Sequence, residues 1–318
     1  MLRKSLRLGG TLVGILFAVS LITFLLMNLA PGDPAQAILG ETATAEAIAA
    51  LRQRLGLDLP MLQRYLNWLS GVLAGDLGES FRANEPVLDA IIGRFPVTLE
   101  LLIGAQIVAL ALALPIGMYT AYRARGTADR AALAVALAFV STPPFLIGIV
   151  LIYVFALLLG VLPATGYVPV HESLSGNLLT MTLPIATLGL FEFPIYMRLL
   201  RSDMIQTLQQ NYISLARAIG LPPWRILVTH ALRPSSLSLI TVVGINMGRL
   251  IGGAVIVEVL FGLPGIGQLL VDGIYQREYL IVQGVVLVVG VFFVLINSLV
   301  DLLYSLLDPR VRIDSVRH

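Results

Sequence analysis

The feature that most constrains this chain is a series of long apolar stretches along its length. A helix needs roughly 20 residues to cross about 30 Å of hydrocarbon, because each residue adds about 1.5 Å. Six stretches reach that length, near residues 9–29, 96–122, 132–160, 178–200, 237–260 and 282–307. Hydrophobic residues make up 57% of the chain and charged residues 13%. This composition predicts an all-α polytopic membrane protein with six transmembrane helices.

Six crossings place both termini on the same side of the membrane, and the positive charges indicate which side. Arginine and lysine gather at the two ends and in the two loops on that side, whereas the 161–177 loop carries neither. Because cytoplasmic loops carry an excess of these residues, the pattern predicts a multi-pass protein with both termini in the cytoplasm. The cations concerned are Arg3, Lys4, Arg7, Arg123, Arg125, Arg130, Arg198, Arg201, Arg217, Arg225, Arg233, Arg310, Arg312 and Arg317.

The segment 31–95 interrupts the series of apolar stretches and is expected on the extracytoplasmic side. It holds five arginines and eight acidic residues, and a segment of this length crosses the membrane largely regardless of its charge. Two amphipathic helices are predicted within it, over 44–56 and 60–75, and the first is expected to be capped by Thr44 or a neighbour. The sequence therefore predicts a helical subdomain after the first span.

Prolines at 115, 143, 144, 184 and 194 lie in or near the predicted spans. Proline lacks an amide hydrogen and clashes with the preceding turn, so several of these helices are expected to be kinked or locally unwound. The run Ser141, Thr142, Pro143, Pro144 in the third span is a candidate for unwound backbone.

The loop between the fourth and fifth predicted spans is long and helix-forming. Its sequence over 211–234 reads NYISLARAIGLPPWRILVTHALRP. An alanine stands on each side of Arg217, and Gly220 with the two prolines after it is expected to end this helix, because glycine adopts left-handed dihedral angles readily. A second short helix is expected from Trp224 toward Pro234. An ordinary solvated loop is the alternative interpretation.

This loop resembles the cytoplasmic coupling loop of binding-protein-dependent ABC importer permeases, in which an alanine-rich helix, a glycine and a further helix precede the next span. Other segments are similar to the dipeptide, oligopeptide and nickel permease family: LAPGDPA at 29–35, LVDGIYQREYLIVQG at 270–284 and VDLLYSLLDPRVR at 300–312. Nearly the whole chain fits that family. Ile219 departs from it where lysine is common, and Pro234 where asparagine is common.

The resemblance implies the type I ABC importer permease fold and a role in ATP-driven import through the bacterial inner membrane. The chain would form half of a translocation pathway for short peptides, dipeptides or oligopeptides, with nickel chelates or glutathione as alternative substrates. An autonomous secondary transporter is the competing class, and it would require inverted repeats and more ionisable residues within spans. The residues implied to couple the chain to the ATPase are Ser214, Leu215, Ala216, Arg217, Ala218, Gly220 and Leu221.

The same resemblance implies the partners and the domain organisation. The partners are a second homologous permease subunit, two ABC ATPase subunits, an extracytoplasmic substrate-binding protein and membrane lipid; no nucleic acid is expected. The ATPases would bind ATP and Mg²⁺, and this chain no cofactor. The expected parts are the N-terminal tail and first transmembrane helix (1–30), the extracytoplasmic helical subdomain (31–95), a five-helix permease core (96–308) with its coupling loop (203–234), and a cytoplasmic tail (309–318).

The 31–95 segment has two interpretations within this organisation. One is a lid that stabilises the first two spans. The other is a docking surface for the binding protein, in which Tyr65, Trp68 and the acidic residues make a partly polar contact that the 161–177 and 261–281 loops complete.

The composition argues against catalysis by the chain itself. Lys4 is the single lysine, and a phosphate-binding P-loop needs a lysine after its glycines. The glycine-rich 262–267 segment follows a predicted span and is interpreted as a turn. The chain has no cysteine and its three histidines fall on separate segments, so no metal site is expected. We therefore expect a non-catalytic subunit with no catalytic residues.

Polar residues inside the predicted spans need a partner or water, because a charge at mid-helix costs about 2.5–3.5 kcal/mol on insertion scales. Glu192 in the fourth span and Arg249 in the fifth are hypothesised to face the interior, as a pair or with separate partners. Ser141, Asn246 and Asn297 are further candidates for the interior or the pathway.

Three glycines in the fifth span recur every four residues, at Gly244, Gly248 and Gly252. This spacing puts them on one stripe of a helix, where a second backbone can approach closely. The stripe predicts a helix-packing seam, and a pore-lining stripe is the alternative.

Overall fold

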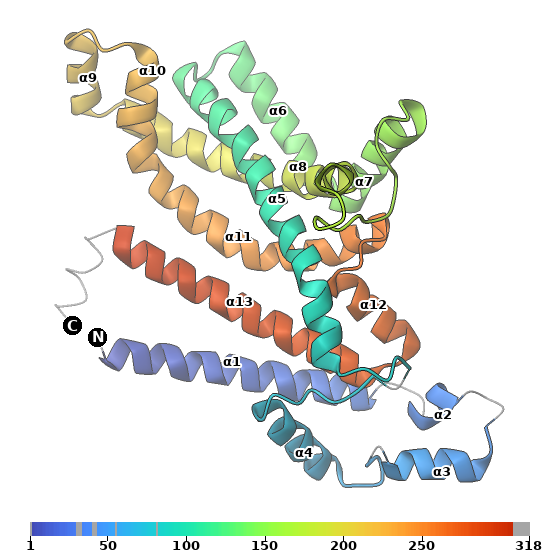
Figure 1. The fold of residues 1–318 in the computed structure, drawn as a ribbon. Coiled ribbons are helices and arrows are strands. Elements are labelled where there is room, and N and C mark those ends of the chain that lie inside the picture. The colour runs from blue at the N-terminus through green and yellow to red at the C-terminus, as the bar shows by residue number, and fades with distance from the viewer. Residues whose placement is uncertain (1, 30–33, 40–42, 55, 81, 308–318) are drawn as a thin grey trace. The chain divides into compact units, whose positions relative to one another are not determined.

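The computed structural model describes residues 2–29, 34–39, 43–54, 56–80 and 82–307, and every regular element in that part of the chain is a helix. Figure 1 shows their order. The elements are α1 (Leu2–Leu29), α2 (Pro34–Leu39), α3 (Ala45–Arg54), α4 (Met61–Leu73), α5 (Val87–Tyr122), α6 (Thr127–Ser141), α7 (Pro144–Leu151), η1 (Ile152–Leu158), α8 (Leu174–Leu208), α9 (Asn211–Ala218), α10 (Pro223–Arg225), η2 (Ile226–Ala231), α11 (Leu232–Phe261), α12 (Ile266–Gln276) and α13 (Tyr279–Leu307).

All six predicted apolar stretches lie on helices, which confirms the all-α membrane architecture. In the described part of the chain, four helical segments are long and apolar enough to cross a bilayer: α5, α8, Pro223–Phe261 and Tyr279–Val300. A bent pair, Thr127–Ser141 with Pro144–Leu158, makes a fifth if it is one span. Within α1, Gly14–Leu26 is a shorter apolar helical segment. The predicted count of six therefore stays a prediction.

The bend between α6 and α7 occurs at the predicted proline run. The chain bends by 105° between the two arms, and Thr142 is extended, with φ −99° and ψ 123°. The residue before a proline is pushed out of the helical region, and Pro144 can begin the next helix because its missing amide would have no helical partner there. The prediction of unwound backbone at this position is confirmed.

The other prolines do not break their helices. Pro115 lies within the continuous helix α5, and Pro184 and Pro194 lie within α8. The last two are buried against neighbouring helices. Packing of this kind holds a proline-containing helix together although one backbone hydrogen bond is lost. Helix α5 also begins at Val87, before the start at 96 that its apolar stretch predicts.

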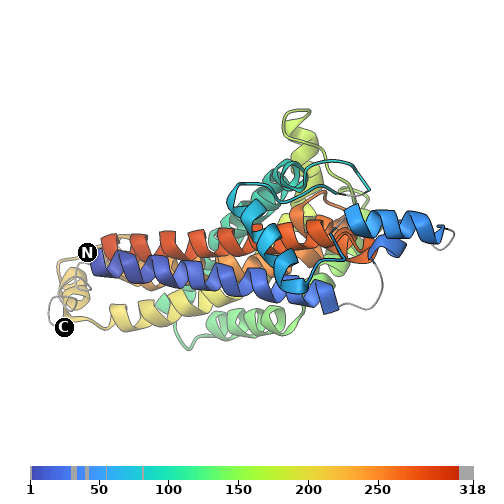
Figure 2. The same cartoon turned by 90° about the horizontal axis from the view of Figure 1, so that it is seen from below.

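The chain divides into two compact units, which are described separately. The first comprises the chain up to Thr98 together with Pro264–Val294. Its core lies where α4, α5, α12 and α13 meet, and the part of α13 before Leu295 lies beside α1 (Figures 1 and 2). The buried residues of this core are Leu77, Val87, Ala90, Ile91, Ile266, Leu269, Ile281, Val285 and Leu287.

The predicted helices of the 31–95 segment are present as α3 and α4. The amide of Ala47 donates to the hydroxyl of Thr44 at 3.3 Å, as expected for an N-cap. The interpretation of Tyr65 and Trp68 as an exposed docking contact is wrong for Tyr65, because its side chain is buried. Both aromatic rings pack beside Phe24 of α1.

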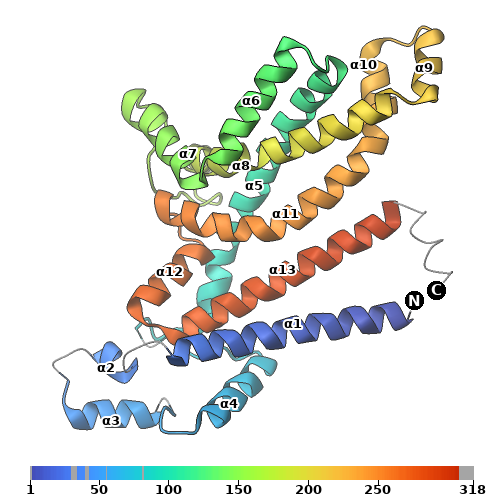
Figure 3. The same ribbon diagram turned by 180° about the vertical axis from the view of Figure 1, so that it is seen from behind.

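The second unit comprises Leu99–Leu263 and the chain from Leu295 onward. Its core joins α5, α6, α8, α9 and α11, and Figure 3 shows α8 and α11 leading to the α9–α10 hairpin at one end. Helix α11 ends at Gly262, which has the left-handed φ of 64°. The 262–267 segment is therefore the turn that the sequence predicts.

Candidate functional site

The α9–α10 hairpin is built around a sharp chain reversal at Gly220. Helix α9 ends where Gly220 adopts φ 81°, and the amides of Gly220 and Leu221 donate to the carbonyls of Arg217 and Ala216 at 3.0 and 3.2 Å. This pair of bonds is a Schellman motif, which satisfies carbonyls that the helix end leaves open. Pro223 then begins α10, as predicted for the helix after the glycine.

One side of the hairpin is anchored in the core of the second unit. Ile213 and Ala216 of α9 and Ile226 and Ala231 of η2 are buried there, together with Leu208 at the end of α8. The hydroxyls of Thr207 and Ser235 also lie 3.1 Å apart and link α8 to α11. The hairpin is therefore attached firmly to the two long helices that flank it.

The opposite side of the hairpin exposes large apolar side chains. One face of α9 carries Tyr212 and Leu215, and Ile219 at the end of the helix continues it, because these residues are spaced by three and four positions. Leu215, Ile219 and Trp224 are 64, 68 and 66% exposed. We call the exposed residues Tyr212, Leu215, Arg217, Ile219, Trp224 and Arg225 the coupling surface. An apolar patch rimmed by polar groups is typical of a protein contact.

The predicted coupling residues divide between the two sides. Ser214, Leu215, Arg217, Ala218 and Gly220 are exposed. Leu221 is half-buried and Ala216 is buried, so these two support the hairpin from below. Tyr212, Ile219 and Trp224 complete the exposed face and were not among the predicted residues. The apolar spacing in α9 and a tryptophan in a polar loop are the sequence signals that point to them.

The second hairpin helix continues into α11 without a break, although Pro234 interrupts its hydrogen bonding. Since Pro234 has no amide, it cannot bond the carbonyl of His230 one turn earlier. The hydroxyl of Tyr212 donates to that carbonyl at 3.5 Å. The preceding residues form the π-helical segment η2, in which the amide of Leu232 reaches the carbonyl of Leu227. The predicted short helix from Trp224 is thus the first part of one long segment.

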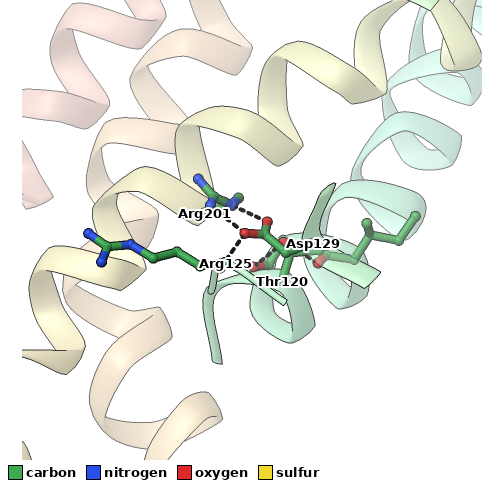
Figure 4. A network of polar contacts seen from close by, with 6 residues as sticks. Thr120, Arg125, Asp129 and Arg201 are labelled. Carbon is green, nitrogen blue, oxygen red and sulfur yellow. Dashed lines mark hydrogen bonds and ion pairs between the residues drawn. The ribbon is translucent and has the colours of Figure 1, made fainter. Parts of the chain in front are cut away.

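An ion pair joins the start of α6 to α8 near the same end (Figure 4). Nε and Nη2 of Arg201 donate to the two carboxylate oxygens of Asp129 at 2.6 and 2.7 Å. The backbone amide of Arg125 donates to the same carboxylate at 2.7 Å, and Arg125 has a positive φ of 68°. Asp129 is buried. Bidentate pairing of this kind fixes geometry as well as adding energy.

Asp129 was not predicted from the sequence, and Arg201 was predicted only as a cytoplasmic charge. The signal in the sequence is an acidic residue in the first turn of a helix that follows Gly126. Its long-range partner lies 72 positions later in the chain, a separation that no local pattern reveals.

A second ion pair links α8 and α11 farther from the hairpin. Nη2 of Arg249 contacts Oε1 of Glu192 at 3.4 Å, and the side chain of Glu192 is 1% exposed while that of Arg249 is 58% exposed. The structure therefore brings together the two charges that the sequence singles out. The other oxygen of Glu192 has no hydrogen-bond partner among the described residues.

Three more buried polar side chains surround this pair. Gln106 of α5, Tyr196 of α8 and Asn246 of α11 lie within interaction range of one another through the Tyr196 hydroxyl, which is also beside Glu192. The Tyr196 hydroxyl, both polar atoms of Gln106 and the amide nitrogen of Asn246 form no hydrogen bond within the described structure. A buried polar group without a partner is unfavourable, so this interior polar cluster is a candidate functional feature. Gln106 and Tyr196 were not predicted.

The remaining predicted residues are dispersed. Ser141 is exposed at the end of α6, and Asn297 is half-buried on α13. Gly244 packs so closely on Val300 that a Cβ at this position would overlap that side chain, Gly248 is buried, and Gly252 is exposed with nothing within 4 Å of a Cβ. The glycine stripe therefore forms a tight helix contact at one of its ends.

Metal ligands do not gather in the described part of the chain: it contains no group of three or more His, Asp or Glu side chains placed to hold an ion. The predicted tail at 309–318 lies outside the described residues.

Outside the spans, one tyrosine is held in a polar contact of the 159–173 loop. The hydroxyl of Tyr167 donates to Oε2 of Glu100 at 3.1 Å. Burial, assisted by the Glu100 carboxylate, raises the pKa of Tyr167 to about 12. The phenol therefore keeps its proton and remains the donor at neutral pH.

Two family models match most of the chain. Residues 113–313 match the family described as binding-protein-dependent transport system inner membrane component, and residues 1–102 match the model for the N-terminal part of the corresponding membrane components.

Two curated relatives match this chain over almost the whole length of both proteins. A Brucella abortus (strain 2308) protein named "Putative peptide transport system permease protein" is 40% identical over 302 residues, covering 95% of this chain and 96% of the relative. The dipeptide transport system permease protein DppB of Escherichia coli (strain K12) is 35% identical over 336 residues, covering 98% and 99%. A chain from inward-facing structures of the MetNI methionine ABC transporter matches with a TM-score of 0.54 and 18% identity, over 68% of this chain and 95% of that chain.

Proposed function

The chain belongs to the family of binding-protein-dependent transport system inner membrane components, and from that premise we propose that it is the permease subunit of an ATP-driven importer of short peptides. It forms half of the translocation pathway beside a second homologous permease subunit. Two ABC ATPase subunits bind the ATP and Mg²⁺, and this chain takes no part in the hydrolysis. The names of the relatives, which refer to peptide and dipeptide transport, support the choice of substrate.

The coupling surface is the observation that carries this proposal. Leu215, Ile219 and Trp224 are exposed on a hairpin whose other side is buried between α8 and α11. Apolar and aromatic side chains of this size serve as interface anchors. A force applied to the hairpin is passed to both long helices because its base packs rigidly against them. The ATPase is the partner that contacts this surface.

The proposal also includes the orientation and the parts of the chain. Both termini and the 203–234 coupling loop lie in the cytoplasm, and the 31–95 segment lies on the side from which the binding protein delivers substrate. The permease core is 96–308. The arginines and the lysine at both ends and in the two loops on the cytoplasmic side support this arrangement, as does the family match.

The interior polar cluster is the proposed polar part of the pathway. Glu192, Tyr196 and Asn246 are hydrogen-bonding groups with capacity left over, and Arg249 presents an exposed guanidinium beside them. Peptide substrates carry amides and charged termini. Groups of these types are able to bind such a substrate transiently when the bundle changes conformation.

The test is co-purification of the ATPase subunits with variants of this chain. The chain is expressed with its partner permease and ATPases, and Trp224→Ala and Leu215→Ser are compared with the unmodified complex. Loss of an aromatic anchor is expected to cost about 2 kcal/mol of binding, or roughly thirty-fold in affinity. Tyr275→Ala, an exposed aromatic on α12 at 84%, is the control and should retain the ATPases. Full recovery of the ATPases and full transport by both coupling-surface variants would contradict the proposal.

Substrate class is tested separately through the binding protein. Its affinity is measured for a dipeptide, an oligopeptide, glutathione and a nickel chelate. Preference for a peptide supports the proposal, and preference for the chelate or glutathione replaces the substrate while leaving the coupling role intact.

A further inference from the structure

Helix α4 has three distinct faces. Successive residues on a helix are rotated by about 100°, so residues spaced by three or four share a face. One face carries Tyr65, Trp68 and Val72, and packs inside the first unit. A second face is polar and exposed, with Gln63, Asn67 and Ser70. The third face is a row of leucines between the other two: Leu62, Leu66, Leu69 and Leu73.

The inner face of α4 packs on the apolar part of α1. The hydroxyls of Tyr65 and Ser20 lie 2.9 Å apart and are buried. The Tyr65 ring also meets Phe17 and Phe24 edge-on, with centroids 6.2 and 5.2 Å away. Figures 1 and 3 both show α4 beside α1. The two helices are therefore in direct contact over the Phe17–Phe24 region.

The position of Ser20 sets the depth of this contact. It lies near the middle of the uncharged 9–29 stretch, with about nine residues, or roughly 13 Å of helix, on either side. If α1 crosses the bilayer, Tyr65 reaches well into the hydrocarbon layer. A helix in a surface subdomain would contact α1 only at its end.

Most of the leucine row is left uncovered by the described residues, and only Leu69 is half-buried. Leu62, Leu66 and Leu73 are 70, 53 and 82% exposed. On α1, Phe17, whose ring meets that of Tyr65, is 51% exposed, and Ile22, on the opposite side of that helix, is 55% exposed. The composition of α4 fits an apolar surrounding, since Arg64 is its only charged residue and lies over the Phe24 ring at 6.0 Å.

We propose that α4 is a membrane-embedded amphipathic helix whose leucine row contacts the acyl chains of the adjoining lipid leaflet. The depth of the Ser20–Tyr65 contact and the exposed Phe17 beside it favour lipid over a protein partner. Amphipathic helices with Trp, Leu and a basic residue bind at the boundary between lipid headgroups and acyl chains. Their apolar face lies in the acyl region and their polar face is turned toward headgroups and water. Here Gln63, Asn67 and Ser70 occupy the polar face. The proposal rests on α1 spanning the membrane and is independent of the substrate.

The experiment uses the natural absence of cysteine from the chain. Single substitutions Leu62→Cys, Leu66→Cys and Leu73→Cys are compared with Gln63→Cys, Asn67→Cys and Ser70→Cys, each labelled with bimane. The assembled transporter is placed in nanodiscs of phosphatidylcholine whose acyl chains carry bromine. Bromolipid quenches a fluorophore among the acyl chains, and aqueous iodide quenches one in water. Ile22→Cys on α1 reports whether that helix itself faces lipid.

The leucine positions are expected to show several-fold more quenching by bromolipid than the three polar positions, with the reverse order for iodide. Iodide quenching of the leucine positions that disappears when the binding protein is added would overturn the proposal in favour of a protein contact. Equal iodide quenching of both rows would place α4 in water and also overturn it. Absence of lipid quenching at Ile22→Cys would remove its premise. Recovery of the ATPases with every variant shows that the coupling role is unaffected by these outcomes.

Discussion

Two carboxylate–guanidinium pairs involve helix α8, and they differ in how fully they are bonded. Asp129 receives two short bonds from Arg201 and a third from the Arg125 amide. Glu192 receives one long contact of 3.4 Å from Arg249, and its second oxygen has no partner among the described residues. Both carboxylates are buried. The same chemistry is therefore saturated at one position of the second unit and unsaturated at another.

The difference indicates two roles. A saturated pair with short bonds has a single favourable geometry, so it holds the α5–α6 turn against α8 while the hairpin beyond α8 is moved. An unsaturated pair has bonding capacity for another partner, and the exposed guanidinium of Arg249 adds to that capacity. This difference fits the proposed function, in which the rigid pair helps to pass force from the hairpin and the incompletely bonded pair lies in the pathway.

The largest expected effect is that of Asp129→Ala. This change leaves the partly buried Arg201 without its partner, and should lower the free energy of unfolding by about 2–3 kcal/mol, less than for a fully buried pair because Arg201 keeps contact with solvent. Thermal unfolding of the purified chain in detergent measures it. Arg125→Gly is the matched control, because it keeps the backbone donor and relieves a positive φ, and it should change stability by no more than about 1 kcal/mol. Equal losses in both variants would assign the stability to the turn instead of the ion pair.

The second expected effect concerns the position of α11, which carries Arg249. Gly244→Ala places a methyl group against Val300, and overpacking of this kind should cost about 1–3 kcal/mol. Gly252→Ala is the control: nothing lies within 4 Å of its Cβ, and replacing a mid-helix glycine should stabilise the helix by up to about 1 kcal/mol. The melting temperatures of the two isolated variants should move in opposite directions. A parallel shift would show that the Gly244 contact is not tight.

The smallest expected change in stability is that of Glu192→Gln. The amide keeps the shape and removes a charge whose contact with Arg249 is long, so the free energy of unfolding should change by less than about 1 kcal/mol. Peptide uptake into proteoliposomes should nevertheless fall several-fold, because a charged group of the proposed pathway is lost. Asp129→Asn in the same assay separates the two pairs. It should lower the free energy of unfolding clearly, whereas peptide uptake per folded molecule should change little. A large stability loss with Glu192→Gln would make the two pairs equivalent and end the comparison.

Much of the fold could be predicted from local patterns. The apolar stretches locate all six long helical regions because lipid demands a continuous apolar surface, and the proline run locates the α6–α7 bend because proline acts on its immediate neighbours. Gly220 and the prolines after it likewise locate the reversal in the hairpin. These features depend on residues close together in the chain.

The residues on each face of the hairpin could be predicted only in part. Ala216 and Arg217 are adjacent in the predicted coupling loop, yet Ala216 is buried and Arg217 is exposed. The docking interpretation of Tyr65 was wrong for the same reason: the amphipathic pattern shows that α4 has an apolar face, but it does not identify α1 as the helix that covers it.

The sequence by itself determined that this chain is a helical membrane protein, where its chain reverses direction, and that it resembles the binding-protein-dependent permease family. Only the tertiary structure decided that Asp129 bonds Arg201, that Glu192 is left incompletely bonded among Gln106, Tyr196 and Asn246, and that α4 lies along α1. The physical reason is distance along the chain. Helix formation, capping and proline breaks act over a few residues, whereas these pairings depend on the packing of helices that lie tens of residues apart.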